Sequence, residues 1–294
     1  MGEEWKPEYS GQRREAGHRQ RHAAGNRTAG VRSVKRRKRN RHIFLKIGLC
    51  LILLLAASRI LPLGMDLASG EGKLALLSLT DARAGEILKN REQYPEELLD
   101  LLKSNEETLD FVLDYPEKKD APPAESIGGV EQGRIPLLLQ WDERWGYGIY
   151  GDDMIALSGC GPTVIAMVAA GLTGDDTVTP YKVAQFAAEN GYYAGDSGTS
   201  WSLMTEGARQ FGIYGEELGL SADAVFSALE AGHPVVCSMS PGDFTTTGHF
   251  IVLTGIEDGR IRVNDPNSRK RSEKLWDFDR LEPQIRNLWV FTAG

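Results

Sequence analysis

Residues 158–163 read Ser-Gly-Cys-Gly-Pro-Thr and lead into the apolar, Ala- and Val-rich stretch 161–172. Pro162 suits the first turn of a helix, because its fixed φ is helical and its missing N–H would have no partner there. We therefore expect a helix that begins close to Cys160. A thiol at a helix N-terminus lies beside unpaired N–H groups and the positive end of the dipole, which favours the thiolate. Cys160 is thus the candidate nucleophile.

The residues that follow predict further helices. Residues 180–190 begin after Thr179, a capping residue, and stop at Gly191. Two more helices are expected over 201–211 and 222–231, each preceded by a Ser or Thr and followed by a Gly. Helices therefore dominate the first half of this region.

Strands dominate its second half. The sequence Glu-Asp-Gly-Arg at 257–260 is a hairpin turn signal between two of them. Helices followed by an antiparallel sheet make an α+β layout. The strands are expected over 234–239, 249–256, 260–264 and 287–292.

Few side chains beyond the apolar N-terminal segment can support nucleophilic chemistry. They are two cysteines, Cys160 and Cys237, and two histidines, His233 and His249. His249 opens an apolar strand after a Thr-rich loop, so the strand would hold its imidazole rigidly at the edge of a cleft. We expect His233 in a turn and Cys237 in the core. Two structural alternatives stay open for Cys160: a buried small apolar side chain, or a disulfide with Cys237.

Two more positions could complete a site. If the strands on either side of 257–260 pair, the end of the second returns toward the start of the first, so Asp265 or Asn264 would lie beside His249. A group there can accept from the far imidazole N–H and fix the tautomer. Gln140 precedes the nucleophile in the chain, and its amide could donate to a developing oxyanion together with the Cys160 N–H.

The order Gln, Cys, His, Asp within one region resembles the C39-like peptidase family of bacterial cysteine peptidases, which has a papain-like fold. The resemblance covers about residues 135–289. It rests on four strings, which are QWDERW at 140–145, SGCGPT at 158–163, GHF at 248–250 and VNDP at 263–266.

The resemblance implies a role for each residue. Gln140 would be the oxyanion donor, Cys160 the nucleophile, His249 the base, and Asp265 its orienting partner, where papain itself uses Asn. The expected reaction is hydrolysis of peptide bonds in a peptide or protein substrate through a thioester, with no metal or organic cofactor. Members fused to peptide exporters remove leader peptides after a double glycine. We expect a member without a transporter domain, so that substrate is not carried over.

Two other functions share this fold. One is a non-catalytic module that binds a peptide or cell-wall ligand in the same cleft. The other is an amidase or transpeptidase that acts on peptidoglycan with the same triad. Both alternatives have the expected fold and differ from a peptidase in the ligand or substrate that the cleft would bind.

The charge of the chain divides sharply. Residues 1–46 hold 14 Lys and Arg against 4 Glu, whereas 19 basic and 37 acidic residues follow Arg59. The acidic body argues against a nucleic-acid-binding domain, since phosphate neutralisation needs clustered Lys and Arg. Residues 1–42 have a disordered composition, and the apolar segment 43–65 is long enough to span a bilayer only if Lys46 and Arg59 snorkel.

The positive-inside rule gives the expected topology. Residues 1–42 would be a cytoplasmic tail, 43–65 a single-pass signal anchor in the cell membrane, and 134–294 an extracellular peptidase domain. A cleaved signal peptide and a buried helix are the alternatives for 43–65. Residues 66–133 are expected to form a helical stalk and a linker. The sequence leaves the oligomeric state open.

Overall fold

The Ala- and Val-rich stretch forms the central helix α7 (Cys160–Thr173), in a computed structural model that describes residues 70–195 and 198–294. Helix α7 begins at Cys160 and ends at Gly174, whose φ of 77° suits glycine. Nearly all of its side chains are buried, as its apolar composition predicts. Short helix α6 (Ile155–Ser158) precedes it, after the small antiparallel pair β1 (Ile149–Tyr150) and β2 (Asp153–Met154).

Other helices pack beside α7. Helix α8 (Pro180–Glu189) has the predicted cap, in which Thr179 Oγ1 accepts from the Lys182 N–H at 3.1 Å. The single helix expected over 201–211 is wrong. The chain instead forms α9 (Ser202–Thr205) and the 3₁₀ helix η4 (Gly207–Phe211), because a glycine weakens an α-helix at that point.

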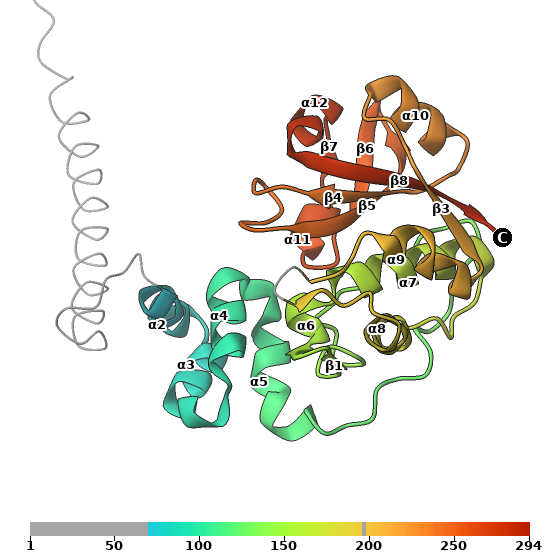
Figure 1. Ribbon diagram of the computed structural model, residues 1–294. Helices are drawn as coiled ribbons and strands as arrows, with labels where there is room; N and C mark the ends of the chain where they lie inside the picture. Colours follow the sequence, from blue (N-terminus) through green and yellow to red (C-terminus); the bar gives the residue numbers. More distant parts are fainter. Residues whose placement is uncertain (1–69, 196–197) are drawn as a thin grey trace, which may run out of the picture. The chain divides into compact units, whose positions relative to one another are not determined.

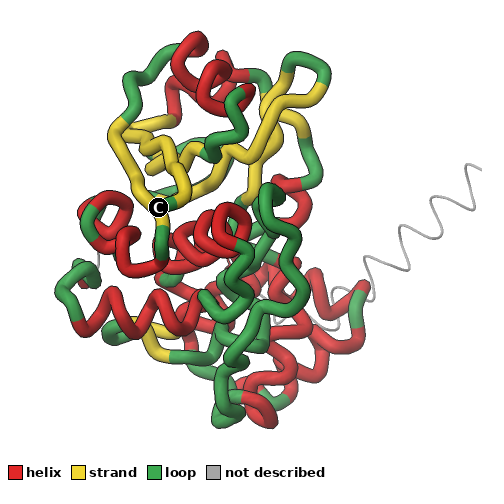
Figure 2. Tube along the Cα trace, turned by 90° about the vertical axis from the view of Figure 1, so that its right-hand side faces the viewer, coloured by secondary structure: helices red, strands yellow, loops and turns green. Residues whose placement is uncertain are grey.

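The second half forms a six-stranded antiparallel sheet, so the expected mixture of helices and an antiparallel sheet is confirmed. Its order is β3-β8-β4-β5-β6-β7 (Figures 1 and 2). The sequence did not predict the two edge strands, β3 and β7. The strands are β3 (Ile213–Glu217), β4 (Val235–Met239), β5 (His249–Glu257), β6 (Arg260–Asn264), β7 (Leu275–Trp276) and β8 (Ile285–Ala293).

The sheet has a hydrophobic core on each face. Phe250 and Val252 of β5 pack with α7 and α8, whereas Ile251 and Leu253 of the same strand pack with α10 (Ala222–Glu230) and α12 (Phe278–Leu281). Figure 1 shows α7 and α8 on one side of the sheet, with α10 and α12 on the other. This arrangement fixes which way each β5 side chain faces.

The β5–β6 hairpin turns where the sequence predicts. Asp258 and Gly259 have φ values of 51° and 72°, as a two-residue turn of this kind requires. One irregularity follows. Leu253 pairs with Val263 but Gly255 pairs with Arg262, so Thr254 is an additional residue on β5, which makes a β-bulge.

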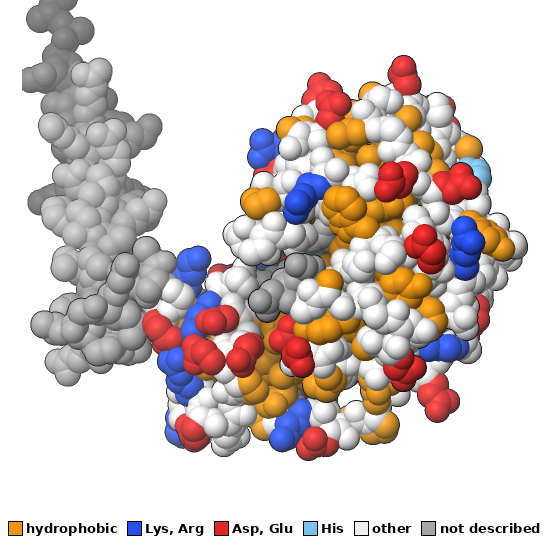
Figure 3. Space-filling model, in the orientation of Figure 1, with side chains coloured by type: hydrophobic (Ala, Val, Ile, Leu, Met, Phe, Trp, Pro, Cys, Tyr) orange, Lys and Arg blue, Asp and Glu red, His pale blue; other side chains and the backbone are white. Residues whose placement is uncertain are grey.

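Helices before residue 119 form a third apolar cluster. It joins leucines of these helices to Leu139, Trp141 and Tyr147, so the helices pack directly on the rest of the described chain. Ion pairs cover their outer side: Lys103 contacts Glu71, Glu96 and Asp100. Figure 3 shows acidic and basic side chains close together over this region. The elements are α2 (Gly70–Thr80), α3 (Ala82–Lys89), η1 (Arg91–Gln93), α4 (Glu96–Ser104), η2 (Glu106–Thr108) and α5 (Leu109–Lys118).

Helix α5 continues for two residues beyond Pro116 to Lys118, with the proline inside the helix. The sequence predicts a linker over 117–133, but residues 117 and 118 belong to α5. Residues 119–133 have no helix or strand and are tied to the rest: the Ile127 N–H donates to Asp176 O at 2.8 Å and the Gly133 N–H to Gly171 O at 2.7 Å.

The expected tail and membrane segment, 1–42 and 43–65, lie outside the described residues. Within 70–195 and 198–294, no helix is both long enough and apolar enough to cross a bilayer.

Candidate active site

Cys160 is the first residue of α7 and is partly exposed. The glycine that follows it is required by close packing: a Cβ on Gly161 would lie 2.4 Å from Thr199 Oγ1. That hydroxyl in turn lies 3.0 Å from Tyr150 Oη, and burial raises the pKa of Tyr150 to about 12. A neutral, hydrogen-bonded tyrosine and a glycine thus hold the first turn of α7 against its neighbours.

The first residue of β5 faces the acid that follows β6. His249 Nε2 lies 2.8 Å from Asp265 Oδ1, and both side chains are buried. The sequence also allowed Asn264 as the residue beside His249. Its side-chain amide instead donates to the carbonyls of Ile135 and Pro136, at 3.2 and 3.0 Å. The hairpin therefore brings Asp265, and not Asn264, to the imidazole.

The environment of His249 favours its charged form. Burial acts to lower the pKa of His249, but the Asp265 carboxylate and a hydrogen bond to Cys160 outweigh burial and raise the pKa to about 9. At neutral pH the ring is then an imidazolium between a carboxylate and a thiol. Cys160, His249 and Asp265 are therefore in one continuous contact chain.

Asp265 is held as a carboxylate from several sides. Its burial acts to raise its pKa, but His249 and Arg271 outweigh burial and hold the pKa below its ordinary value. Arg271 Nε donates to Oδ2, and the Asn267 N–H donates to Oδ1 at 2.8 Å. The Ser272 hydroxyl accepts from the Asp265 N–H at 2.9 Å. The carboxylate is thus fixed in orientation by its own loop.

Gln140 lies in the same cleft. Its side-chain amide donates to the carbonyls of Ala156 at 2.8 Å and Leu157 at 3.4 Å, and its buried Oε1 has no partner within the described residues. Its own N–H donates to Pro266 O at 2.8 Å, which ties it to the acid loop. In this arrangement the amide hydrogens face α6, so the oxyanion role of Gln140 stays a prediction.

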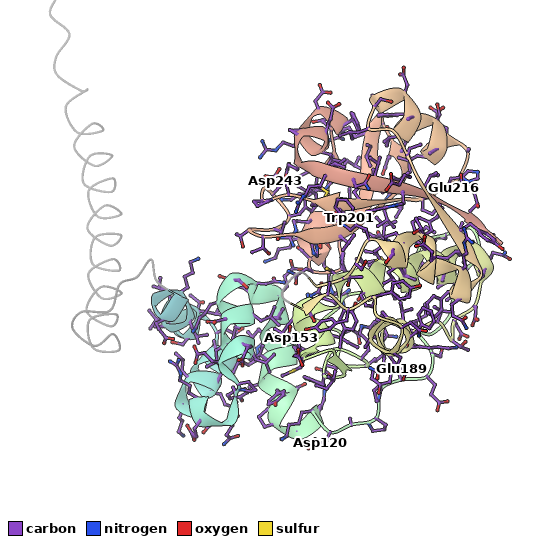
Figure 4. All side chains as sticks on the ribbon, in the orientation of Figure 1. Asp120, Asp153, Glu189, Trp201, Glu216 and Asp243 are labelled. Atoms are coloured by element: carbon purple, nitrogen blue, oxygen red, sulfur yellow. The ribbon has the colours of Figure 1, made fainter. Side chains whose placement is uncertain are left out.

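Two adjoining cavities meet at Cys160 and His249. One, of about 750 Å³, extends toward α4 and the loop 242–248. The other, of about 440 Å³, extends toward Trp201 and Arg286. Asp153, from the helical part (Figure 4), lines both. Together they form a cleft that runs past the thiol on both sides.

Other candidates from the sequence lie elsewhere. Cys237 is fully buried in β4, burial raises its pKa, and both it and Cys160 are free thiols, so the disulfide alternative is wrong. His233 lies before β4 and lines neither cavity of the cleft. A separate cavity of about 870 Å³, between residues 123–126 and α8, has neither a Cys nor a His in its lining.

Sequence reasoning missed the residues that hold the acid loop. Arg271 follows Asp265 by six residues, a spacing with no periodic signature. Asn105 and Glu107 contact the loop across more than 160 residues of sequence. Only the folded arrangement brings these groups together.

Comparison with known proteins gives a family and several solved structures. Residues 133–292 match the model of the Peptidase_C39 like family, a range that includes Gln140, Cys160, His249 and Asp265. No curated protein matches the sequence.

Solved structures similar to this chain include three peptidases. The peptidase domain of Streptococcus ComA, a bi-functional ABC transporter involved in a quorum-sensing pathway, is 19% identical, with a TM-score of 0.36, covering 47% of this chain and 93% of that one. A double glycine motif protease from an AMS/PCAT transporter, in complex with a leader peptide, is 16% identical (TM-score 0.33; 57% and 99% covered). A putative C39-like peptidase from Bacillus anthracis is 18% identical (TM-score 0.31; 55% and 97% covered).

Proposed function

Because the chain belongs to the Peptidase_C39 like family, we propose that it is a cysteine peptidase in which Cys160, His249 and Asp265 hydrolyse peptide bonds on a papain-like fold. The observation that carries this proposal is the 2.8 Å contact between His249 Nε2 and Asp265 Oδ1 at the wall of the cleft that Cys160 lines.

The reaction starts from a charged pair. A pKa of about 9 for His249 supports an imidazolium at neutral pH. In the proposed reaction the Cys160 thiol transfers its proton to the imidazole, and the resulting thiolate lies beside an imidazolium that Asp265 stabilises and orients.

The thiolate attacks the carbonyl carbon of the scissile bond, and the carbonyl oxygen takes the negative charge. His249 gives its proton to the leaving nitrogen, the C–N bond breaks, and an acyl thioester remains on Cys160. Neutral His249 then accepts a proton from water, whose oxygen attacks the thioester. The carboxyl product leaves and the thiolate–imidazolium pair is restored.

The oxyanion needs donors during both attacks. The N–H of Cys160 opens α7, where a backbone donor lacks an intrahelical partner. Gln140 would supply a second donor if one amide hydrogen turned from the α6 carbonyls toward the substrate. We include Gln140 in the proposal on its position in the cleft.

Covalent capture tests the proposal. The full chain, incubated with a peptidyl vinyl sulfone, should form one adduct per chain, located at Cys160 by mass spectrometry. Cys237 serves as the internal control, because a fully buried thiol should stay unlabelled in the folded protein. A folded chain that forms no adduct at Cys160 with a panel of such peptides, and releases no fragment from them, would refute a peptidase function.

We also propose that the peptidase acts on the outside of the cell membrane, anchored by residues 43–65. The excess of Lys and Arg before the apolar segment supports this topology. External protease added to intact cells should remove an epitope at the C-terminus and spare one at the N-terminus. Protection of the C-terminal epitope until lysis would overturn the topology and leave the chemistry untouched.

A further inference from the structure

The loop that follows Asp265 is held largely by groups from far upstream. Residues 265–268 connect β6 to the short helix α11 (Arg269–Ser272), which supplies Arg271 and Ser272 to the Asp265 carboxylate and backbone. Any movement of this loop therefore moves the acid that faces His249.

Glu107, in η2, makes three contacts to this loop. Its Oε1 accepts from the hydroxyl of Ser268, and its Oε2 accepts from the N–H groups of Arg269 at 2.9 Å and Lys270 at 3.3 Å. One carboxylate thus satisfies both backbone donors at the start of α11 as well as the side chain that caps it. Ser268 itself is buried.

Asn105, two residues before Glu107, also contacts the loop that follows Asp265. Asn105 Nδ2 donates to Asn267 O at 2.7 Å, while Asn105 Oδ1 accepts from the Glu107 N–H at 3.1 Å, which fixes Glu107 in turn. Trp141 Nε1 also donates to Asn267 O, at 3.2 Å. Asn105 and Asn267 both line the 750 Å³ cavity beside Cys160. The α4–η2 corner is therefore part of the cleft wall and part of the loop's support.

We propose that Glu107 is a positioning residue of the active site, which fixes the 265–270 loop and, through it, the Asp265 carboxylate against His249. This inference rests on the proposed peptidase function. It assigns the α2–α5 helices, which lie before the family-matched residues 133–292, a share in catalysis rather than the role of a detachable stalk.

The physical consequence falls on His249. Its elevated pKa depends on the close carboxylate, since burial alone lowers it. If the loop loosens, Asp265 spends less time at hydrogen-bond distance and the imidazolium loses its main stabilising partner. The charged groups that face His249 are Asp265, with Arg271 behind it, and the thiol of Cys160. The cavity wall adds the carboxylates of Glu97, Asp100, Asp153 and Asp243.

The test is the pKa of His249, measured by NMR on the full chain with ¹⁵N-labelled histidine and assigned by comparison with His249→Gln. Glu107→Ala should lower that pKa by about one unit. It should also lower kcat on a cleaved peptide roughly 10- to 100-fold with a smaller change in KM. Glu107→Gln, which keeps an acceptor oxygen, should recover part of both effects.

Matched variants separate positioning from charge and from folding. Glu106→Ala removes the same charge from the adjacent, exposed position and should leave the pKa of His249 unchanged. In an Asp265→Ala background, adding Glu107→Ala should produce no further shift. If Glu107→Ala does not fold, Glu107→Gln decides, because it preserves shape and should still lower the pKa by a fraction of a unit.

A folded Glu107 variant with an unshifted His249 pKa overturns the proposal, as does an equal shift in Glu106→Ala. The titration needs no substrate, so it distinguishes the two proposals. Failure to capture Cys160 with peptide probes would refute the peptidase while the coupling of Glu107 to His249 could still be measured.

Discussion

The two halves of the cleft present their chemical groups in different ways. The helical half supplies Cys160 from the start of α7, where one short string determines the helix start, the thiol and the glycine beside it. The sheet half supplies His249 and Asp265 from two strands that meet only when β5 and β6 pair in the correct register. The proposed nucleophile thus depends on local sequence, whereas its proposed partners come together only in the folded sheet.

This difference tells which changes each half tolerates. A substitution at the start of α7 acts on the thiol itself, with the sheet intact. A change in the sheet half acts on the distance between the His249 imidazole and the Asp265 carboxylate. A small displacement of either strand separates the two groups. The following changes test that separation, beginning with the largest effect.

Cys160→Ala should abolish peptide hydrolysis, lowering kcat by on the order of 10⁴-fold or more, with stability close to wild type, since the site is partly exposed. Cys237→Ser is its counterpart in the sheet half: it should keep activity but lose about 1–3 kcal/mol of unfolding free energy, because a hydroxyl replaces a fully buried thiol. Steady-state assays and urea denaturation measure both. Peptide hydrolysis by Cys160→Ala would show that Cys160 is not the nucleophile.

Asp265→Asn tests the sheet half without removing its shape. It should lower kcat by about 10²- to 10⁴-fold and bring the pKa of His249 down from about 9, because the carboxylate is the main group that raises it. A pH–rate profile shows the change as an earlier alkaline limb. An unchanged profile would mean that Asp265 does not orient or stabilise His249.

Stability should depend on pH through the same histidine. The pKa of His249 is raised from 6.5 to about 9 on folding, so its stabilising contribution is complete below pH 6.5 and is lost as the pH rises to 9. The expected loss is on the order of 3 kcal/mol. Urea denaturation at pH 6 and pH 9.5 measures it, with His249→Gln as the control that should remove this pH dependence.

The smallest effect concerns charge along the cleft. Glu97 and Asp153 line the 750 Å³ cavity and form no ion pair within the part of the chain that the structure describes; Asp243, from the sheet half (Figure 4), also lines it. A cationic thiol reagent should therefore label Cys160 about two- to fivefold faster than an anionic one at low salt, and the ratio should fall toward one at high salt. Equal labelling rates for the two reagents at both ionic strengths would contradict a negative electrostatic potential in the cleft.

Local signals explain what the sequence predicted well. The helix start at Cys160, the cap at Thr179 and the turn at 257–260 each depend on adjacent residues, and all three appear in the structure. From the turn alone the approach of Asp265 to His249 could be predicted. The choice between Asp265 and Asn264 could not, because it depends on the bulge at Thr254.

The groups around the site were beyond sequence reasoning for a physical reason. Glu107 and Arg271 belong to segments whose packing is decided by the whole fold, and nothing in their local sequence marks them. The prediction of one α-helix over 201–211 was wrong because helix propensity alone favoured it. In the structure the chain changes to a 3₁₀ helix at Gly207, a residue that weakens an α-helix. The edge strands were missed since β7 is only two residues long and β3 contains a glycine.

Because side chains alternate between the two faces of a strand, the bulge at Thr254 decides whether Asp265 lies on the same face of the sheet as His249. With Thr254 bulged out of the ladder, Leu253 pairs with Val263 and Asp265 is in phase with His249. If Thr254 instead paired with Val263, Leu253 would lie opposite Asn264 and Asp265 would turn to the opposite face of the sheet. Residues added at the tip of the turn leave that phase unchanged. Among descendants of this gene, length changes should therefore accumulate at 258–259, and odd-numbered ones between His249 and Val252 should abolish the activity in a single step.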